Sequence, residues 1–225
     1  METFKAILCI VGACVFSYAL GSISFAVIFS KLFAKKDVRD FGSGNAGMTN
    51  VMRAVGVLPG ILTFVCDVLK GAAACAAAKY LFFPYVFELG IHPWLNPVYG
   101  AYFCGLLCII GHAFPIFFGF KGGKGIATSV GIFAVCCYPA IIAGLAVFIL
   151  CVLISKIVSL SSILAAITVA IGVFFAHESV NPAYPTTPAF ILTALIALFV
   201  IIKHKDNIIR LINGEEKRLV VRKGE

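Results

Sequence analysis

A glycine-rich segment at residues 42–56 combines residue types that bind phosphate groups. Its glycines allow successive backbone N–H groups to converge on an anion, and its hydroxyl and amide side chains add hydrogen-bond donors. Arg53 adds a planar guanidinium that can bind one phosphate through two N–H groups. We therefore expect a phosphate site here rather than an ordinary surface loop, with these candidate ligands: Gly44, Asn45, Thr49, Asn50 and Arg53.

A second glycine-rich segment covers residues 119–125, where four glycines flank two lysines. The lysines place positive charges beside accessible backbone amides, and a helix expected from about Ile126 directs its N-terminus toward the same place. This pattern predicts a second phosphate-binding element, with these candidate ligands: Lys121, Gly122, Gly123, Lys124 and Gly125.

Neither segment fits a nucleotide-binding motif. Gly125 stands where a Walker A loop has Ser or Thr after its lysine. Gly42, Gly44 and Gly47 satisfy G-x-G-x-x-G, but the dinucleotide motif requires a preceding strand, and an apolar membrane helix is expected before this segment. No nucleotide cofactor is therefore expected.

Two further polar segments carry candidate residues with an equally simple structural explanation. Ser159, Ser161 and Ser162 begin an apolar stretch, so any one of them can serve as a helix cap. His204 and Asn207 lie directly after the last apolar stretch, where basic and polar residues often mark only the membrane boundary.

Asp67 and Lys70 lie three residues apart within an apolar stretch, so one helix face presents both. Ionisable residues at such a depth indicate a functional site, although a structural ion pair explains them equally well. The nine cysteines all lie in apolar stretches without a C-x-x-C pair or clustered histidines, which argues against a metal centre or a disulfide framework.

The composition indicates what must position these residues. The 225-residue chain is 61% hydrophobic and 12% charged, with a mean hydropathy of +1.06, which soluble domains do not reach. The net charge of +8 comes from basic residues in short segments between apolar stretches, not from one continuous basic face, so nucleic acid is not an expected partner. The sequence predicts an all-α integral membrane protein.

Apolar stretches of sufficient length predict seven transmembrane helices. They lie near residues 4–30, 56–80, 97–118, 126–138, 139–155, 160–177 and 188–202, in a single domain of residues 1–225. The fourth and fifth would meet at Tyr138 and Pro139, and the fourth is short for a crossing. A six-span arrangement with a re-entrant fourth segment remains open.

The distribution of basic residues predicts the orientation. Basic residues gather on one side of the spans, in segments 31–53, 121–124 and 203–223 and at Lys156. The opposite side, with outer loops 81–96 and 178–188, has little beyond Lys79 and Lys5 near the N-terminus. We therefore expect the N-terminus outside and a cytoplasmic tail over residues 203–225.

Taken together, the motifs resemble those of the bacterial membrane family that transfers an acyl group from acyl phosphate to glycerol 3-phosphate. The resemblance covers nearly the whole chain in order. It is carried by GSGNAGMTNVMRAVG (42–56), DVLKG (67–71), GHAFPIFFGFKGGKGIAT (111–128), SLSS (159–162) and HKDNIIRL (204–211).

The resemblance implies a multi-pass enzyme of the bacterial cytoplasmic (inner) membrane, with seven spans and an active site at the cytoplasmic side. Its substrates would be acyl phosphate and glycerol 3-phosphate, and its products lysophosphatidic acid and inorganic phosphate, in the first committed step of phospholipid synthesis. No metal or other cofactor is implied, and coupling to the enzyme that makes acyl phosphate is a further expected partnership. Phosphate-binding and catalytic roles would fall on Ser43, Arg53, Lys124, His204, Asn207 and a serine of 159–162, of which Ser159 matches the motif best.

The chemistry of the residues agrees with this activity. An acyl phosphate is already activated, so the enzyme must mainly hold two anions, neutralise them and align the acceptor hydroxyl, and no covalent intermediate is needed. The H-x-x-x-x-D pattern of other glycerolipid acyltransferases is absent from the sequence, so His204 and a substrate phosphate oxygen are both candidate bases. A transporter of phosphate esters is the main alternative, and an acyl thioester is an alternative donor.

Overall fold

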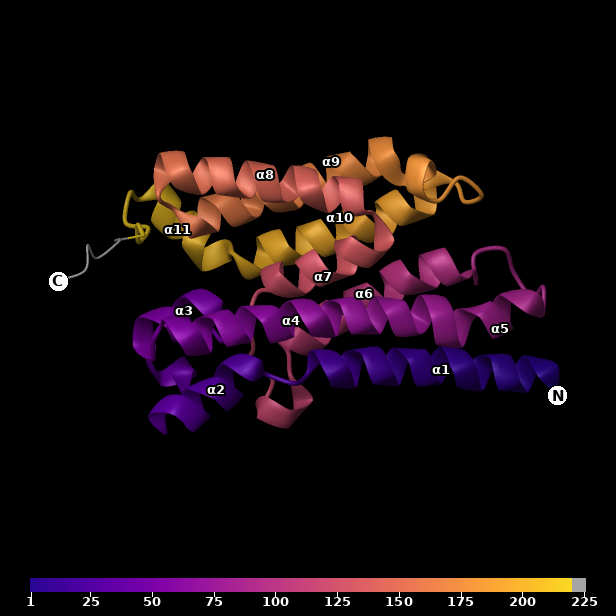
Figure 1. Ribbon diagram of the computed structural model, residues 1–225, viewed down its shortest axis with the longest axis horizontal. Helices are drawn as coiled ribbons and strands as arrows, with labels where there is room; N and C mark the ends of the chain where they lie inside the picture. Colours follow the sequence, from indigo (N-terminus) through magenta and orange to yellow (C-terminus); the bar gives the residue numbers. More distant parts are fainter. Residues whose placement is uncertain (220–225) are drawn as a thin grey trace. The chain divides into compact units, whose positions relative to one another are not determined.

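The described part of the chain is helical, as expected for apolar segments that must satisfy every backbone N–H and C=O away from water. A computed structural model describes residues 1–219, and these residues contain no strand (Figure 1). The all-α prediction is confirmed for them. The chain divides into two compact units, residues 1–136 and 137–225, which are described separately.

The first unit is built around a long helix, α4. It comprises α1 (Glu2–Gly21), α2 (Phe25–Ala34), η1 (Val38–Asp40), α3 (Met48–Ala54), α4 (Val57–Ala77), η2 (Ala78–Phe82), α5 (Phe83–Glu88), α6 (Pro97–Ala113), η3 (Ile116–Phe118) and α7 (Ile126–Cys136). Helix α4 contacts α1, α2, α3, α6 and α7, and α1 also packs along α6. The short helices α2 and α3 gather around the N-terminal half of α4 (Figure 1).

Glycines bring the helices of this unit close together. A Cβ atom at Gly21 would overlap the Cys108 carbonyl, and one at Gly71 would overlap the Thr128 carbonyl. Small residues allow this close approach of helix backbones in membranes, where packing rather than the hydrophobic effect drives association.

Two helices of the first unit are interrupted, at residues 22–24 between α1 and α2 and at residues 114–125 between α6 and α7. Non-helical backbone is tolerated at membrane depth where protein surrounds it. Gly111 lies against the Tyr18 carbonyl and the Ser22 amide, so the two interruptions are neighbours. The first predicted span, 4–30, is therefore two helices and not one.

Within the described residues, the second unit is simpler, with three long helices and one short one. It comprises α8 (Tyr138–Ser155), α9 (Val158–Val180), α10 (Thr186–Lys203) and the short α11 (Lys205–Ile212). Helix α9 packs against both α8 and α10 (Figure 1). Lys156 adopts a left-handed conformation with φ 60° and joins α8 to α9.

Six of the seven predicted spans coincide with a segment that is long and apolar enough to cross a bilayer. Within residues 1–219 these segments are Glu2–Ala34, Val57–Glu88, Pro97–Phe118, Tyr138–Ser155, Val158–Val180 and Thr186–Lys203. Helix α7 has 11 residues, and at a rise of about 1.5 Å per residue it spans about half of a ~30 Å hydrocarbon core. Its crossing of the membrane stays a prediction.

Other boundaries also move. The second span continues through the π-helical turn η2 to Glu88, so the expected outer loop 81–96 begins eight residues late, at Leu89. The fourth and fifth helices meet at Cys137, one residue before the predicted pivot, because Pro139 is accommodated in the first turn of α8. Residues 205–212 of the predicted tail form α11, and residues 220–225 lie outside the described residues.

Candidate functional site

Asn50 organises the first glycine-rich loop from within. This buried side chain accepts a hydrogen bond from the Ser43 amide at 3.1 Å and donates to the Val38 and Phe41 carbonyls, both at 2.9 Å. Gly42, with φ +64°, lies against the same side chain, and a Cβ there would overlap its oxygen. Asn50 was predicted to bind phosphate. In this structure both of its N–H groups bind backbone instead, and we assign it to loop support.

The remaining polar groups of this loop lie nearer the surface. Ser43 and Arg53 are exposed, and Asn45 and Thr49 are half-buried. Arg53 makes no hydrogen bond or ion pair with any residue in the described range 1–219. Arg53 lies in the last turn of the short helix α3, and its side chain has no internal partner among these residues. Its guanidinium is therefore available to an anion.

The second loop uses its glycines for packing. The Gly122 amide donates to the Ala113 carbonyl at 3.2 Å, and the Gly123 amide donates to the His112 carbonyl at 3.1 Å. A Cβ on either glycine would overlap the end of α6. The prediction that these two amides bind phosphate is therefore corrected, because their N–H groups already have backbone acceptors.

The cations of the second loop remain candidates. Lys121 is exposed and Lys124 is half-buried, at the point where the chain turns into α7. Gly125 is buried with φ +90°, a conformation that favours glycine, and it starts the turn that leads into α7. Phosphate binding by this loop therefore depends on its lysine side chains rather than on the amides of Gly122 and Gly123.

Arg39 joins the two loops, although the sequence indicated only a topology charge there. Its guanidinium forms an ion pair with Asp37 at 2.8 Å and donates to the carbonyls of Phe118 and Lys121. The Arg39 hydrogen bonds lower the pKa of the Asp37 carboxyl, outweighing the effect of its partial burial. A long-range bridge of this kind has no signature in sequence spacing.

Asp67 and Lys70 form the ion pair that their spacing predicted, and a third residue joins them. Lys70 Nζ lies 2.8 Å from Asp67 Oδ1 and 3.0 Å from His112 Nδ1. It also donates to the Ile23 carbonyl at 2.8 Å, in the break between α1 and α2. All three side chains are buried.

The second unit contains a polar cluster centred on Glu216. Its Oε1 accepts hydrogen bonds from Ser159 Oγ at 2.8 Å and Asn207 Nδ2 at 2.7 Å, and its Oε2 accepts from Arg210 Nε at 2.7 Å. Burial opposes ionisation, but these three donors and the Arg210 charge outweigh it and lower the pKa of the Glu216 carboxyl. Glu216 was not among the predicted site residues, because no sequence pattern in the tail indicates that the tail folds back onto α9 and α11.

The geometry separates the three serines that the sequence left open. Ser161 and Ser162 donate to the carbonyls of Ile157 and Val158 one turn earlier in α9. Ser159 instead hydrogen bonds to Glu216, a residue 57 positions away. Ser159 thus differs from the other two serines in its hydrogen-bond partner, and its functional role stays a prediction.

His204 is held by its own helix. Its Nδ1 lies 2.7 Å from the Val200 carbonyl, and a carbonyl can only accept, so Nδ1 carries the proton. In the neutral ring Nε2 is then the basic nitrogen. Within residues 1–219, no group of three or more His, Cys, Asp or Glu side chains could hold a metal ion.

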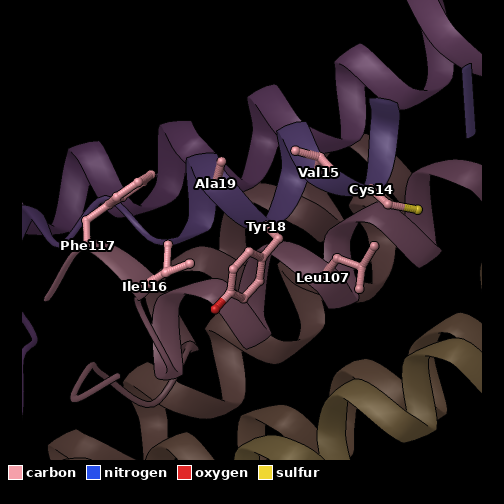
Figure 2. Close-up of a pocket in the computed structure, with 7 residues that line it drawn as sticks. All are labelled: Cys14, Val15, Tyr18, Ala19, Leu107, Ile116 and Phe117. Atoms are coloured by element: carbon pink, nitrogen blue, oxygen red, sulfur yellow. The ribbon is translucent and has the colours of Figure 1, made fainter. Parts of the chain in front are cut away.

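An apolar pocket of about 410 Å³ opens between α1, α6 and η3 (Figure 2). Tyr18 lies at its centre and donates to the Phe114 carbonyl at 2.9 Å, which ties α1 to the start of the segment that leads into the second loop. The lining residues are Cys14, Val15, Tyr18, Ala19, Leu107, Ile116 and Phe117.

Comparison with known proteins finds similarity along nearly the whole chain. The family model described as glycerol-3-phosphate acyltransferase matches residues 11–214. The chain is 40% identical over 206 residues to glycerol-3-phosphate acyltransferase 2 of Bacillus anthracis, covering 92% of this chain and 97% of that protein. It is also 40% identical over 205 residues to a glycerol-3-phosphate acyltransferase of Listeria monocytogenes, covering 90% and 93% of the two chains.

Two crystal structures have the same fold. Both are of PlsY, an integral membrane glycerol 3-phosphate acyltransferase. The glycerol 3-phosphate form matches with a TM-score of 0.77 and 37% identity over 94% of this chain and 96% of that one. The lysophosphatidic acid form matches with a TM-score of 0.75 and 36% identity over 94% and 95%.

Proposed function

Because the chain belongs to the glycerol-3-phosphate acyltransferase family and is an acyltransferase of the membrane, we propose that it transfers a fatty acyl group from acyl phosphate to glycerol 3-phosphate. A glycerol hydroxyl oxygen attacks the acyl carbonyl carbon, and the bond from that carbon to the phosphate oxygen breaks. The hydroxyl proton leaves, and the products are lysophosphatidic acid and inorganic phosphate. This would be the first committed step of phospholipid synthesis.

The observation that carries this proposal is the pair of cation-bearing loops in the first unit. Arg53 follows one loop, Lys121 and Lys124 belong to the other, and Arg39 bridges the two. Both substrates of the proposed reaction carry a phosphate group, and neutralising two neighbouring anions requires more than one cation. In an acyl thioester donor the leaving group is a thiol, so no phosphate is attached to the acyl carbon.

We assign the direct phosphate contacts to side chains rather than to the packed amides. The guanidinium of Arg53 can bind one phosphate through two N–H groups, whereas Lys124 supplies a point charge. Ser43, Gly44, Asn45 and Thr49 remain candidate donors of the first loop. Their contribution is to hold the acceptor in place, which can account for a large part of the rate enhancement.

For the second unit, we retain phosphate-binding or proton-transfer roles for Ser159, His204 and Asn207. His204 is the candidate base: its Nδ1 carries the proton that the Val200 carbonyl accepts, so Nε2 is the basic nitrogen of the neutral ring. Ser159 and Asn207 share Glu216 as their acceptor and are thereby oriented. A phosphate oxygen of the bound substrate is the alternative base.

The apolar pocket suits the acyl chain of the donor. Its lining residues come from two candidate membrane spans, Glu2–Ala34 and Pro97–Phe118. Ile116 and Phe117 at its edge (Figure 2) are followed in the chain by the loop that carries Lys121 and Lys124. A lipid chain seated there would bring its activated end toward those cations. Each methylene removed from water contributes about 0.8 kcal/mol.

The proposed topology has seven crossings, with α7 and the loop before it completing the fourth, the N-terminus outside and the basic loops cytoplasmic. This would place the active site at the cytoplasmic side of the bacterial inner membrane, where coupling to the enzyme that makes acyl phosphate is a further expectation. Ser43→Cys, in a background without other cysteines, should resist an impermeant thiol reagent in intact cells and react after permeabilisation. Labelling from outside would overturn the orientation.

The activity is tested with purified protein in lipid. Acyl phosphate, acyl-CoA and acyl carrier protein thioester are offered in parallel, each with glycerol 3-phosphate, and lysophosphatidic acid is measured. We expect product only with acyl phosphate, together with release of inorganic phosphate. Product from a thioester would replace the proposed donor, and uptake of glycerol 3-phosphate into proteoliposomes without acyl transfer would favour a transporter.

A further inference from the structure

The charges of α4 differ in burial from the cations that we assign to phosphate, which are exposed or half-buried. The side chains of Asp67 and Lys70 are 3% and 1% exposed, so solvent cannot stabilise either charge. Charged groups at such a depth are costly, and replacing a buried ion pair by apolar residues is often neutral or stabilising. Stability alone therefore does not explain this pair, and its contacts suggest a different role.

Lys70 connects three elements of the first unit through its ammonium group. It forms an ion pair with Asp67 on its own helix, contacts His112 Nδ1 at the end of α6, and donates to the Ile23 carbonyl between α1 and α2. Its charge and its hydrogen bonds therefore act on three different elements. The Ile23 carbonyl lies at a helix break, where a buried acceptor needs a partner. Lys70 thus fixes the position of that break relative to α6.

His112 extends this network to the second loop. Lysine can only donate, so His112 Nδ1 accepts and the neutral ring carries its proton on Nε2. The His112 carbonyl accepts the Gly123 amide at 3.1 Å. The histidine therefore holds the loop through its backbone while Lys70 holds the histidine through its ring.

Gly123 is also the point where the two glycine-rich loops meet. A Cβ atom there would lie 2.6 Å from the Ala46 carbonyl of the first loop, shorter than side chains tolerate. It would also overlap the Nε2 end of the His112 ring. The backbone of each loop and the histidine ring thus pack around one Cα atom, and a displaced His112 would change the spacing between the loops.

We propose that Asp67, Lys70 and His112 are positioning residues that set the distance between the two phosphate-binding loops. This inference rests on the proposed function for its kinetic consequences. Two anionic substrates react only if the hydroxyl and the acyl carbon are held at bonding distance, and small misplacements in such a site cost large factors in rate. The network would act on catalysis without touching either substrate.

The test combines a kinetic and a structural measurement on the full-length protein. The double variant Asp67→Asn/Lys70→Met removes both charges with little change in volume, so neither charge is left unpaired. We expect kcat to fall by about tenfold or more while the KM for glycerol 3-phosphate changes by less than about threefold. The number of glycerol 3-phosphate sites per chain, measured by equilibrium binding, should stay the same, whereas simple misfolding would lower it in proportion to kcat.

The structural measurement does not depend on activity. Spin labels at Phe41→Cys and Phe120→Cys, both exposed positions beside the two loops, report the distance between the loops in a background cleared of the nine native cysteines. We expect a narrow distance distribution with the native network and a broader or shifted one in the double variant. If the double variant folds poorly, Gly123→Ala tests the same contact, because its added methyl group would overlap the His112 ring and the Ala46 carbonyl. It should change the distance between the labels in a similar way.

Thr63→Val is the matched control, because Thr63 is a buried residue of α4 whose hydroxyl bonds only the Pro59 carbonyl of its own helix. It should leave kcat and the label distance near their native values. Native kcat in the double variant, or an unchanged distance distribution in both variants, would overturn the proposal. If the native protein fails to use acyl phosphate but the distances change as expected, the proposed function fails and the positioning role stands.

Discussion

The polar clusters centred on Lys70 and on Glu216 show two ways of stabilising a charge in a membrane protein. Lys70 lies within a membrane-spanning helix, and its side chain is 1% exposed. Glu216 follows the last described helix, and its partner Arg210 is 36% exposed. Each central group has three polar partners in the structure: Lys70 forms an ion pair and two hydrogen bonds, and Glu216 accepts three hydrogen bonds.

The difference between the clusters lies in what can replace a lost partner. The side chains of Asp67 and Lys70 are almost fully buried, so removal of one charge leaves the other uncompensated in a medium of low dielectric constant. The Glu216 side chain is 8% exposed, but the exposed side of Arg210 allows water to replace a lost partner, and such a partly exposed ion pair is worth less than a buried one. The cost of a substitution should therefore follow burial rather than the number of hydrogen bonds.

Lys70→Met should show the largest effect, because it leaves the Asp67 carboxylate buried without its main counter-charge. Loss of one partner of a buried pair costs about 3–5 kcal/mol. We expect a large drop in thermal stability in detergent, with most of it recovered in Asp67→Asn/Lys70→Met. If the single and the double variant are equally stable, the Lys70 cluster does not behave as a buried ion pair.

Arg53 differs from Lys70 and Glu216 because it has no hydrogen-bond or ion-pair partner within residues 1–219. Arg53→Lys therefore extends the comparison to a cation without an internal partner. The charge remains, but the paired N–H donors of the guanidinium are lost. We therefore expect kcat/KM to fall roughly tenfold or more, which corresponds to about 1.5–3 kcal/mol of lost transition-state stabilisation. Thermal stability should not change. Steady-state kinetics at subsaturating substrates would measure the effect, and Lys124→Ala should do comparable harm.

Lys217→Ala is the control for these substitutions, since Lys217 is an exposed charge of the tail. It should leave kcat/KM nearly unchanged. Full activity of Arg53→Lys, or equal losses for Lys217→Ala and Lys124→Ala, would show that the basic residues are topology signals and not phosphate ligands.

Glu216→Gln tests the more exposed cluster. Glutamine keeps an acceptor for Ser159 and Asn207 but loses the charge that pairs with Arg210, so a loss of about 1 kcal/mol is expected near neutral pH. The loss is expected to be smaller than for Lys70→Met. Thermal stability in detergent measures both losses. A larger loss for Glu216→Gln than for Lys70→Met would contradict the expectation that the cost follows burial.

The pH dependence of this cluster has a definite sign. The folded pKa of Glu216 is lowered, so its ionised form stabilises the fold above the unfolded value of about 4.3, and this contribution is lost as the pH falls through the lower folded value. The stability difference between the native protein and Glu216→Gln should therefore shrink below about pH 4. A difference that grows toward acid pH would contradict the assignment.

Ala19→Phe should have only a small effect on stability, because the pocket between α1 and α6 has no charge to leave unpaired. The larger side chain would occupy space that we assign to the acyl chain, at about 0.8 kcal/mol for each methylene displaced. The KM for a long-chain acyl phosphate should rise about fourfold for each such methylene, with a short-chain donor nearly unaffected. Equal effects on both donors would place the acyl chain elsewhere.

The sequence predicted which residue types lie in the candidate site better than it predicted which groups each residue contacts. Arg53, Lys124 and Ser159 occupy positions consistent with the predicted roles, and the spacing of Asp67 and Lys70 correctly indicated an ion pair. Spacing works for that pair because residues three apart on a helix are neighbours whatever the rest of the fold does. The same is true of the all-α assignment.

The assignments that changed depend on contacts between distant segments. Gly122 and Gly123 carry amides suited to phosphate, but the end of α6 already supplies their acceptors. Arg39 and Glu216 gained roles because each contacts residues far away in the chain. No local sequence pattern indicates which carbonyl accepts a hydrogen bond from a given amide N–H.

The sequence by itself determined the membrane class and the helical architecture, because hydropathy and backbone hydrogen bonding within a helix are local properties. It also supplied the cations and glycines from which an anion site can be built. Only the tertiary structure decided which of these groups already have partners. That outcome depends on the packing of α1, α4 and α6 around Lys70 and His112, where a buried donor or acceptor must be satisfied by whatever segment the fold brings within hydrogen-bonding distance.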